Sequence, residues 1–434
     1  MLPGPIRPGT VRGSVALGVA LFTVLGASDC GRIRYDALGP VPLDGAIDAG
    51  TPTDADLSDG PASEDAATDD GGVPADGGGP VPANVRLTDD AYRSAAPSIA
   101  VGGGRYMVTW SDDRVGELEV IARVFDPSFV AVASEIRLTT TTASSEAAVP
   151  IWNGASWGIF WLEIGTTSAT VWAAEVSADG TTVVTAPRAL SGATSAGGNV
   201  SVTFGDGVYI VAWADQRFGG ASVMLARVPI GLATAPMEQR LTTGAGRAYF
   251  PSVAWSGSEV GVFYNDDRAG NLEIYFSRTT PNLVAMGETR ITNTAGISAA
   301  PVCVWTGAEY AVVWNDQGST DDDVWFGAVS TTGAAVATFE VATPASTLFP
   351  GVAYGGGALM LVWGDDRGTA RQVFGETIDA AARTESTQIR VSDGPGDAPA
   401  GFPWVAADGA AFPVVWADTR DGNSEIYGVR LTPP

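Results

Sequence analysis

An aspartate followed two places later by an arginine recurs along this chain, each time just after an aromatic residue. The five copies of this Asp-x-Arg motif are Asp112/Arg114, Asp215/Arg217, Asp266/Arg268, Asp365/Arg367 and Asp418/Arg420. A carboxylate and a guanidinium at this spacing can bind each other or a polar ligand. Because the motif repeats, we interpret it mainly as structural, with the Asp accepting hydrogen bonds from turn amides and the Arg pairing with a neighbouring repeat. An Arg in the place of a second oxygen ligand argues against calcium.

Two copies break this pattern. The second reads Trp161-Leu-Glu163 without an arginine, and the fifth reads Trp314-Asn-Asp-Gln317 followed by three acidic residues, Asp321, Asp322 and Asp323. An acidic cluster beside a site of broken symmetry is a candidate contact for a partner or a cation. The alternative is sequence drift in a tolerant surface turn. We expect no resident metal and no cofactor.

The composition removes several kinds of chemistry. The chain has no His, and all 24 of its basic residues are Arg. It therefore lacks an imidazole base, a histidine metal ligand, a Ser-His-Asp triad and a Schiff-base lysine. Chemistry between carboxylates, or a Tyr or Ser nucleophile served by Asp, Glu or Arg, is still open. No such constellation stands out, and we predict that the protein is not an enzyme.

The charge balance narrows the partners. The 434 residues include 49 acidic against 24 basic side chains, a formal net charge of −25 at pH 7. Nucleic acid and anionic lipid both require a basic surface and are disfavoured. An acidic surface also keeps an exported protein soluble. The two cysteines, Cys30 and Cys303, offer no disulfide framework, and Cys303 is expected to be a buried, unreactive thiol.

The first 83 residues differ from the rest. Arg7 and Arg12 precede an apolar stretch, residues 15–27, which has the length of a signal-peptide core and is too short to span a bilayer. We predict a signal peptide over residues 1–29. Residues 30–83 are rich in Asp, Gly, Pro and Ala, which predicts a disordered acidic tether. Its segment Asp54–Gly60 lacks the Glu of a calcium loop, and we interpret it as tether.

An apolar run of five residues that ends on an aromatic returns seven times, closing at Trp110, Trp161, Trp213, Tyr264, Trp314, Trp363 and Trp416. The spacing of 49 to 53 residues marks units that must stack to bury their faces. Each unit has four short β-rich segments bounded by turn residues, in the fourth copy residues 251–255, 259–264, 271–278 and 288–292. The last unit lacks its fourth segment, whereas a spare one, residues 84–88, precedes the first. The sequence predicts an all-β, seven-bladed β-propeller of four-stranded blades over residues 84–434, closed by the N-terminal strand completing the last blade.

Two resemblances follow from these motifs. The Asp-x-Arg turn, which several copies continue as Gly-Asn-x-Glu-Ile-Tyr, together with the Arg-Leu-Thr strand and the Pro-led first strand, resembles the TolB-type (WD40-like) propeller repeat of bacterial envelope proteins. Seven copies depart from the six blades of TolB itself, so its role is not carried over. The segment Ser28-Asp29-Cys30-Gly31 resembles a bacterial lipoprotein lipobox, which implies lipidation of Cys30. Asp29 departs from the small uncharged residue usual before that Cys.

These features favour a non-catalytic binding or scaffold module at the bacterial cell envelope. We expect a monomer on the outer membrane or cell surface, alternatively secreted or periplasmic, whose partner is an envelope protein or a glycan and whose only membrane contact is the lipid anchor. One alternative is a lectin-like propeller that binds glycans through the Asp-x-Arg residues. Another is a sialidase-like glycoside hydrolase, to whose Asp-box the segment Ser177-Ala-Asp-Gly-Thr181 is faintly similar. A residue set unique to one blade and converging on the central channel would indicate an enzyme.

Overall fold

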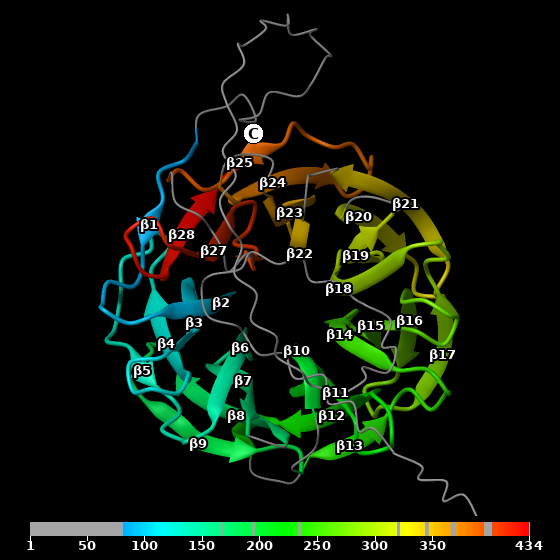
Figure 1. The fold of residues 1–434 in the computed structure, drawn as a ribbon, viewed down its shortest axis with the longest axis horizontal. Helices are drawn as coiled ribbons and strands as arrows, with labels where there is room; N and C mark the ends of the chain where they lie inside the picture. The colour runs from blue at the N-terminus through cyan, green and yellow to red at the C-terminus, as the bar shows by residue number, and fades with distance from the viewer. Residues whose placement is uncertain are drawn as a thin grey trace, which may run out of the picture. The chain divides into compact units, whose positions relative to one another are not determined.

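The computed structural model describes residues 81–433 except for seven short gaps, at 166–167, 193–195, 233–235, 319–321, 343–346, 366–369 and 395–401. The described residues form seven four-stranded antiparallel sheets. The sheets stand around a common axis as blades (Figure 1). The prediction of an all-β, seven-bladed propeller is confirmed. The predicted signal peptide, Cys30 and nearly all of the predicted tether lie outside the described residues.

Each blade runs from an innermost strand beside the axis to an outermost strand at the rim (Figure 1). The innermost strands, in blade order, are β2 (Ser94–Gly102), β6 (Ser144–Trp152), β10 (Ala196–Gly205), β14 (Ala248–Trp255), β18 (Ile297–Trp305), β22 (Thr347–Gly355) and β26 (Trp404–Val405). The second strands are β3 (Arg105–Asp112), β7 (Ser156–Ile164), β11 (Val208–Asp215), β15 (Val260–Asp266), β19 (Tyr310–Gln317), β23 (Ala358–Asp365) and β27 (Phe412–Asp418).

The third and outermost strands complete the blades. The third strands are β4 (Glu119–Phe125), β8 (Ala169–Ser177), β12 (Ser222–Pro229), β16 (Glu273–Thr279), β20 (Asp322–Val329), β24 (Gln372–Asp379) and β28 (Glu425–Leu431). The outermost strands are β5 (Ile136–Arg137), β9 (Val183–Ala189), β13 (Met237–Arg240), β17 (Ala285–Arg290), β21 (Ala335–Ala342), β25 (Ile389–Arg390) and, in blade 7, β1 (Val85–Arg86). A short 3-10 turn, η1 (Ile230–Leu232), joins β12 to β13. Among the described residues no helix is long and apolar enough to cross a membrane.

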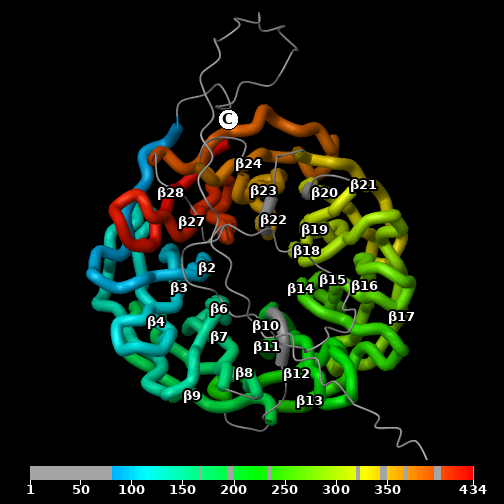
Figure 2. Tube along the Cα trace, viewed as in Figure 1, coloured from blue at the N-terminus to red at the C-terminus, as the bar shows by residue number. Residues whose placement is uncertain are grey.

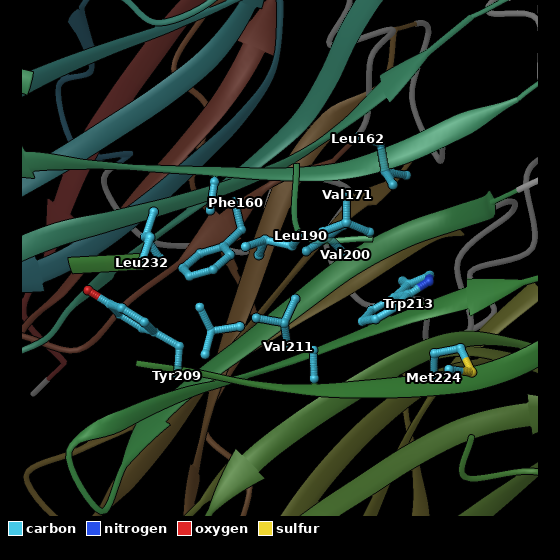
Figure 3. Close-up of a cluster of buried hydrophobic side chains, with 13 residues drawn as sticks. Phe160, Leu162, Val171, Leu190, Val200, Tyr209, Val211, Trp213, Met224 and Leu232 are labelled. Carbon is cyan, nitrogen blue, oxygen red and sulfur yellow. The ribbon is translucent and has the colours of Figure 1, made fainter. Parts of the chain in front are cut away.

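The second strand of each blade is covered on both faces by side chains. All eight residues of β11 are buried. Figure 3 shows Tyr209, Val211 and Trp213 of this strand packed against Phe160 and Val171 of the preceding blade. Burying such apolar surface contributes about 25 cal/mol per Å². Because a blade buries its faces only against its neighbours, the ring is stable only when every blade has two of them.

Buried hydroxyl groups also join neighbouring blades. Tyr209 of blade 3 donates to Glu175 of blade 2 (2.9 Å), and Tyr106 of blade 1 donates to Asp408 of blade 7 (2.8 Å). Burial, together with the bond to Asp408, raises the pKa of Tyr106 to about 12. These hydrogen bonds give partners to polar atoms that are buried at the interfaces between blades and cannot bind water.

In three blades a buried glutamate links the third strand to the outermost strand. A Glu that begins the third strand accepts hydrogen bonds from an Arg and a Thr on, or just after, the outermost strand, and we call this arrangement the Glu-Arg-Thr lock. Its members are Glu119, Arg137 and Thr139 in blade 1, Glu273, Arg290 and Thr292 in blade 4, and Glu425, Arg86 and Thr88 in blade 7. Each of the three glutamates is fully buried. A carboxylate in such a place is tolerated only while it is paired.

Blade 7 is built from both ends of the described chain. Strand β1 pairs with β28, and the amide of Leu87 donates to the carbonyl of Ile426 (2.7 Å). Figure 2 shows this meeting as a blue segment beside a red one. The prediction that the N-terminal strand completes the last blade is confirmed. The strand has only two residues, so the Glu425 lock supplies much of what holds it in place.

We expect Arg86→Met to lower the free energy of unfolding by about 2–3 kcal/mol, because it leaves the buried Glu425 carboxylate without its cation. Urea denaturation of the full chain measures the change. Adding Glu425→Gln to the same chain should restore most of the loss, since a neutral amide needs no cation. A loss below about 0.5 kcal/mol for Arg86→Met, the range of ordinary surface substitutions, would contradict this role of the lock.

Candidate functional site

One face of the ring carries both the Asp-x-Arg turns and the starts of the innermost strands. In blade 4 the first residue of β14, Ala248, pairs with Asp266 at the end of β15, where the Asp-x-Arg turn begins. In blade 1 Ser94 pairs with Asp112 in the same way. We call this side of the propeller the turn face. Residues from blades that are not neighbours can meet there only near the axis, where the innermost strands come together.

The four described Asp-x-Arg pairs bind internally. In blade 1 the Asp112 carboxylate accepts from the Arg114 amide (2.9 Å) and its Nε (2.6 Å). Asp112 is fully buried. The same amide-to-carboxylate bond, at 2.8 to 2.9 Å, and an ion pair recur in Asp215/Arg217, Asp266/Arg268 and Asp418/Arg420. Asp365 is buried as well, whereas Arg367 lies outside the described residues.

The arginines of these turns find their second partner in two ways. Arg217 pairs with Glu238, and Arg268 with Glu288, on the outermost strand of the same blade. Arg420 pairs with Asp393, which follows the outermost strand of the preceding blade. Pairing with a neighbouring blade, as the sequence predicted, therefore holds for only some copies. In every described copy the polar groups of the motif already bind one another, and the structure does not bring the motifs together into one site.

The two copies that break the pattern leave a carboxyl group without an arginine two residues later. Asp316 of blade 5 is nearly buried and accepts from Ser298 Oγ (2.6 Å) and Trp314 Nε1 (3.3 Å). Burial raises its pKa, and the nearby charge of Glu273 raises it further. Burial likewise raises the pKa of Glu163 in blade 2, to which the charge of Glu119 adds. A carboxyl group that keeps its proton at a higher pH can act as an acid.

The predicted acidic cluster is only partly visible. Asp321 lies outside the described residues, Asp322 begins β20, and Asp323 stands opposite Asp316 in the β19–β20 ladder. Among the described residues no three His, Cys, Asp or Glu side chains are placed to hold a metal ion. The segment 177–181 forms the turn between β8 and β9, where Asp179 bonds to its neighbours Ser177 and Thr181.

A strained backbone position marks the start of the innermost strands. Six of these strands carry a bulge in their pairing with the second strand. Five non-glycine residues at these bulges have positive φ, namely Ala96 (47°), Ala147 (54°), Phe250 (50°), Ala300 (53°) and Phe349 (48°). A left-handed conformation costs an L-residue about 1–2 kcal/mol, and a bulky side chain is seldom found there. A Phe in this position is the kind of outlier that suggests a function.

The two phenylalanines at these bulges meet a third, Phe402, which lies just before β26. The ring centroids of Phe250 (blade 4) and Phe349 (blade 6) are 6.3 Å apart, and those of Phe349 and Phe402 (blade 7) are 4.4 Å apart. Because blade 5 separates blades 4 and 6, their side chains can touch only by reaching in towards the axis. Phe402 is 42% exposed, and the other two rings are half-buried. We call these three residues the axial phenylalanine cluster.

The residue at the position of these phenylalanines differs between blades. Blades 1, 2 and 5 carry Ala96, Ala147 and Ala300 at the corresponding bulge. The turn-face end of the axis is therefore aromatic towards blades 4, 6 and 7 and carries small side chains at the bulges of blades 1, 2 and 5. This is an asymmetric feature in a symmetric fold, and its partly exposed rings offer an apolar surface.

The preceding blade fixes the bulge at two of these positions. The side-chain oxygen of Asn315 accepts from the amide of Phe349 (3.1 Å), and that of Asn265 accepts from the amide of Ala300 (3.2 Å). Asn315 is the residue before Asp316 on β19, so the residue that holds Phe349 is the chain neighbour of the residue whose carboxyl group has a raised pKa. Such hydrogen bonds hold the strained backbone in one conformation.

The sequence carried a signal for this cluster that we did not use. Phe-Pro occurs at 250–251, 349–350 and 402–403, where the first and fifth copies have Ala-Pro. We interpreted the Pro-led first strand as a structural mark of the repeat. That interpretation did not consider the residue before the Pro, which is the one that points towards the axis.

A second buried carboxyl group lies in blade 6. Glu376 of β24 is 3% exposed, and its strand neighbours on the same face, Phe374 and Ile378, pack against blade 5. Burial, aided by the charge of Glu385, raises its pKa from 4.5 to about 8, partly offset by a hydrogen bond from Gln388. In the axial region the thiol of Cys303 on β18 has its pKa raised to about 12 by burial, which leaves it unreactive at neutral pH.

No family model matches the chain, and no curated protein matches its sequence. Solved structures share its fold. An oligogalacturonate lyase from Vibrio parahaemolyticus superposes with a TM-score of 0.50 at 12% identity, covering 80% of this chain and 93% of the lyase. The polysaccharide lyase Uly1 superposes with a TM-score of 0.51 at 6% identity, covering 78% of this chain and 90% of the lyase. At such identities the likeness is one of fold.

These comparisons correct one prediction. We predicted that the protein is not an enzyme because it lacks His and Lys and shows no familiar catalytic constellation. Both superposed structures are enzymes that span nearly the whole ring, so the prediction is wrong. The prediction rested on the absence of a familiar catalytic constellation in the sequence. A ring can assemble its site from single residues of separate blades.

We expect Phe349→Gly to leave the free energy of unfolding within about 1 kcal/mol of the wild type, because glycine relieves the left-handed strain as the ring contacts are lost. Chemical denaturation measures it. The matched control is Phe263→Ala in β15, a fully buried ring whose removal should cost about 3–5 kcal/mol. Equal losses for the two variants would show that Phe349 is a core residue and contradict its assignment to a binding surface.

We expect the stability of the protein to fall between about pH 4.5 and pH 8 through Glu376. The unfolded chain releases this proton near pH 4.5, whereas the folded chain keeps it up to about pH 8. The free energy of unfolding therefore decreases as the pH rises through this window, by an amount on the order of a few kcal/mol, and then levels off.

Glu376→Gln removes this dependence. Its melting temperature should match the wild type near pH 4 and exceed it near pH 9. Glu340→Gln, at an exposed position on β21, serves as the control for loss of charge. A difference between Glu376→Gln and wild type that is the same at both pH values would contradict the raised pKa.

Proposed function

We propose that the propeller is a carbohydrate-active module which takes a glycan against the axial phenylalanine cluster and acts on it there. The observation that carries the proposal is the meeting of Phe250, Phe349 and Phe402 at the axis, where all three are partly exposed and the first two stand on strained backbone. Aromatic faces stack on the apolar C–H face of a sugar ring, much as they stack on other flat ligands. The resemblance in fold to an oligogalacturonate lyase and a polysaccharide lyase supports a carbohydrate as the substrate.

The charge of the ring favours a neutral glycan. Residues 84–434 contain 37 acidic side chains against 20 arginines. On the turn face the arginines of the Asp-x-Arg motif are paired with carboxylates in each described copy. A polyanionic chain would meet net repulsion on approach and find few unpaired cations. A neutral sugar escapes both penalties and needs only the aromatic surface and hydrogen bonds.

The carboxyl group of Asp316 is the proton donor we assign to the reaction. Its neighbour Asn315 holds Phe349, it has no arginine two residues later, and its pKa is raised. A carboxyl group of raised pKa can donate a proton to a leaving oxygen, and such acids contribute about 10²–10⁴-fold to rates. This route needs neither His nor Lys, which the chain lacks.

The location of the protein belongs to the same proposal. The apolar N-terminal stretch supports export, and Cys30 supports attachment to a lipid at the cell envelope, with residues 30–83 as a tether. A glycan-active ring held outside the cytoplasm would meet polysaccharides of the envelope or of the surroundings. The resemblance of the repeat to that of TolB-type envelope proteins supports the same location.

The test is a panel of neutral and acidic glycans incubated with the full chain, read for both retained glycan and released sugar. We expect retention of a neutral glycan and release of a smaller product. The triple variant Phe250→Ala, Phe349→Ala and Phe402→Ala should lose at least tenfold in affinity, since each stacked ring is worth about 1–3 kcal/mol. Asp316→Asn should keep retention and lose about 100-fold or more in release.

The matched control is Phe218→Ala. This phenylalanine follows Arg217 in a turn-face turn and is 45% exposed, close to the exposure of Phe402. Its removal should leave both readouts unchanged. If Phe218→Ala weakened retention as much as the triple variant, or if no glycan were retained by the wild type, the axial cluster would not be a sugar-binding surface.

A further inference from the structure

Phe349 is the central ring of the axial phenylalanine cluster. Its centroid lies 6.3 Å from that of Phe250 and 4.4 Å from that of Phe402, so it takes part in both ring contacts. Aromatic pairs at such distances attract each other while the rings keep their places. A change in the direction of the Phe349 side chain would alter both contacts at once.

The backbone of Phe349 does not favour this direction by itself. Its φ of 48° lies in the left-handed region, which a bulky L-residue seldom adopts. A return to negative φ would turn the Cα–Cβ bond and carry the ring away from its neighbours. The ring therefore keeps its place only while another group fixes the bulge.

A hydrogen bond from the preceding blade supplies this restraint. The side-chain oxygen of Asn315 accepts from the amide of Phe349 (3.1 Å). Asn315 follows the buried Trp314 on β19 and stands opposite Ala299 and Val324 in the two ladders of that strand, so its own backbone is firmly placed. The net free energy of one hydrogen bond and the cost of a left-handed residue are of similar size. The bond can therefore decide between the two conformations of Phe349.

Asparagine stands at this position in only two blades. In blades 4 and 5 the residue after the closing aromatic is Asn265 and Asn315, whereas in blades 1, 2, 3, 6 and 7 it is Ser111, Leu162, Ala214, Gly364 and Ala417. The blades that precede Phe250 and Phe402 are blades 3 and 6, whose residues at this position have no side-chain oxygen. Of the three rings in the cluster, the central one is thus the one that such an asparagine holds.

Asn265 separates the local effect of the bond from its effect on the cluster. Its side-chain oxygen accepts from the amide of Ala300 (3.2 Å), in the same way as Asn315 accepts from Phe349. Both bonds hold a bulge with positive φ, of 53° at Ala300 and 48° at Phe349. Ala300 carries only a methyl group, so the bond in that blade directs no aromatic ring. The two asparagines share a structural role, and Asn315 has a second consequence that Asn265 lacks.

We propose that Asn315 is a positioning residue that acts through Phe349 and keeps the axial phenylalanine cluster formed before a sugar ring arrives. The ligand in this inference rests on the proposed function, whereas the effect on Phe349 does not. A site that is formed in only a fraction of the molecules loses affinity by that fraction. The bond to Asn315 removes this loss, because the central ring is already directed towards its neighbours.

The first experiment needs no glycan. Crystal structures of the full chain are determined for the variants Asn315→Ala and Asn265→Ala. We expect Phe349 to return to negative φ in Asn315→Ala, with its ring moved away from Phe402. In Asn265→Ala the cluster should be unchanged. A Phe349 that keeps its positive φ and its contact with Phe402 in Asn315→Ala would overturn the proposal.

Two further variants keep this experiment decisive. Asn315→Ser copies blade 1, where Ser111 occupies the position and its hydroxyl donates to the carbonyl of Ser145 (3.4 Å). It removes the acceptor for the Phe349 amide and replaces Asn315→Ala if that variant does not fold. Asn315→Asp keeps an acceptor oxygen in the same place, and we expect the Phe349 ring to stay where it is in the wild type.

The second experiment measures kinetics on the neutral glycan of the panel that the wild type retains and cleaves. We expect Asn315→Ala to raise KM about fivefold and to leave kcat unchanged, because bound sugar selects the formed cluster. Asn265→Ala should change neither constant, and Asn315→Asp should restore most of the loss. In a chain that already carries Phe349→Ala, adding Asn315→Ala should raise KM no further, since the positioned ring is gone.

The outcomes separate this inference from the proposed function. An equal rise in KM for Asn265→Ala and Asn315→Ala would reduce the role of Asn315 to general support of the fold. A further rise in the Phe349→Ala chain would show that Asn315 acts by another route. If the wild type retained no glycan, the proposed function would fail, and the crystal structures would still decide whether Asn315 positions Phe349.

Discussion

The mutual burial of neighbouring blades is the constraint on which this structure depends. A strand such as β11, with every residue buried, has no stable place outside a stack. Each blade therefore needs two neighbours, and a row of blades must close on itself. Closure depends on the two-residue strand β1, which pairs with β28 and carries the arginine that neutralises the buried Glu425. Because strand β1 closes the ring, it helps to keep the apolar interfaces between all the blades buried.

Repetition also explains where function can arise. A symmetric ring places the same position of every blade around one axis, so a change of residue type in some blades creates an uneven surface there. At the residue before the Pro of the innermost strands the change is from Ala to Phe, and the aromatic rings meet although their residues are 99 and 53 positions apart. This departure keeps the backbone of the repeat and alters only the side chain that it presents.

The sequence predicted the architecture well because apolar periodicity and turn residues are local properties. In blade 4 the predicted segments 251–255 and 271–278 correspond to β14 and β16 within a few residues. Closure followed from the unmatched strand at the front. The axial cluster could not be derived in the same way, because it depends on which side chains converge on the axis, and that depends on the bulge at positive φ. The Phe-Pro pairs were visible, but their convergence was not.

The account rests on the claim that a glycan docks on the axial phenylalanine cluster. The most direct measurement is a crystal structure of the full chain grown with a neutral oligosaccharide that it retains. We predict a sugar ring stacked on Phe349 and Phe402, with the chain extending over the small residues of blades 1, 2 and 5. A sugar bound instead between adjacent blades at the Asp-x-Arg turns, with the axis empty, would contradict the account and support a lectin-like arrangement.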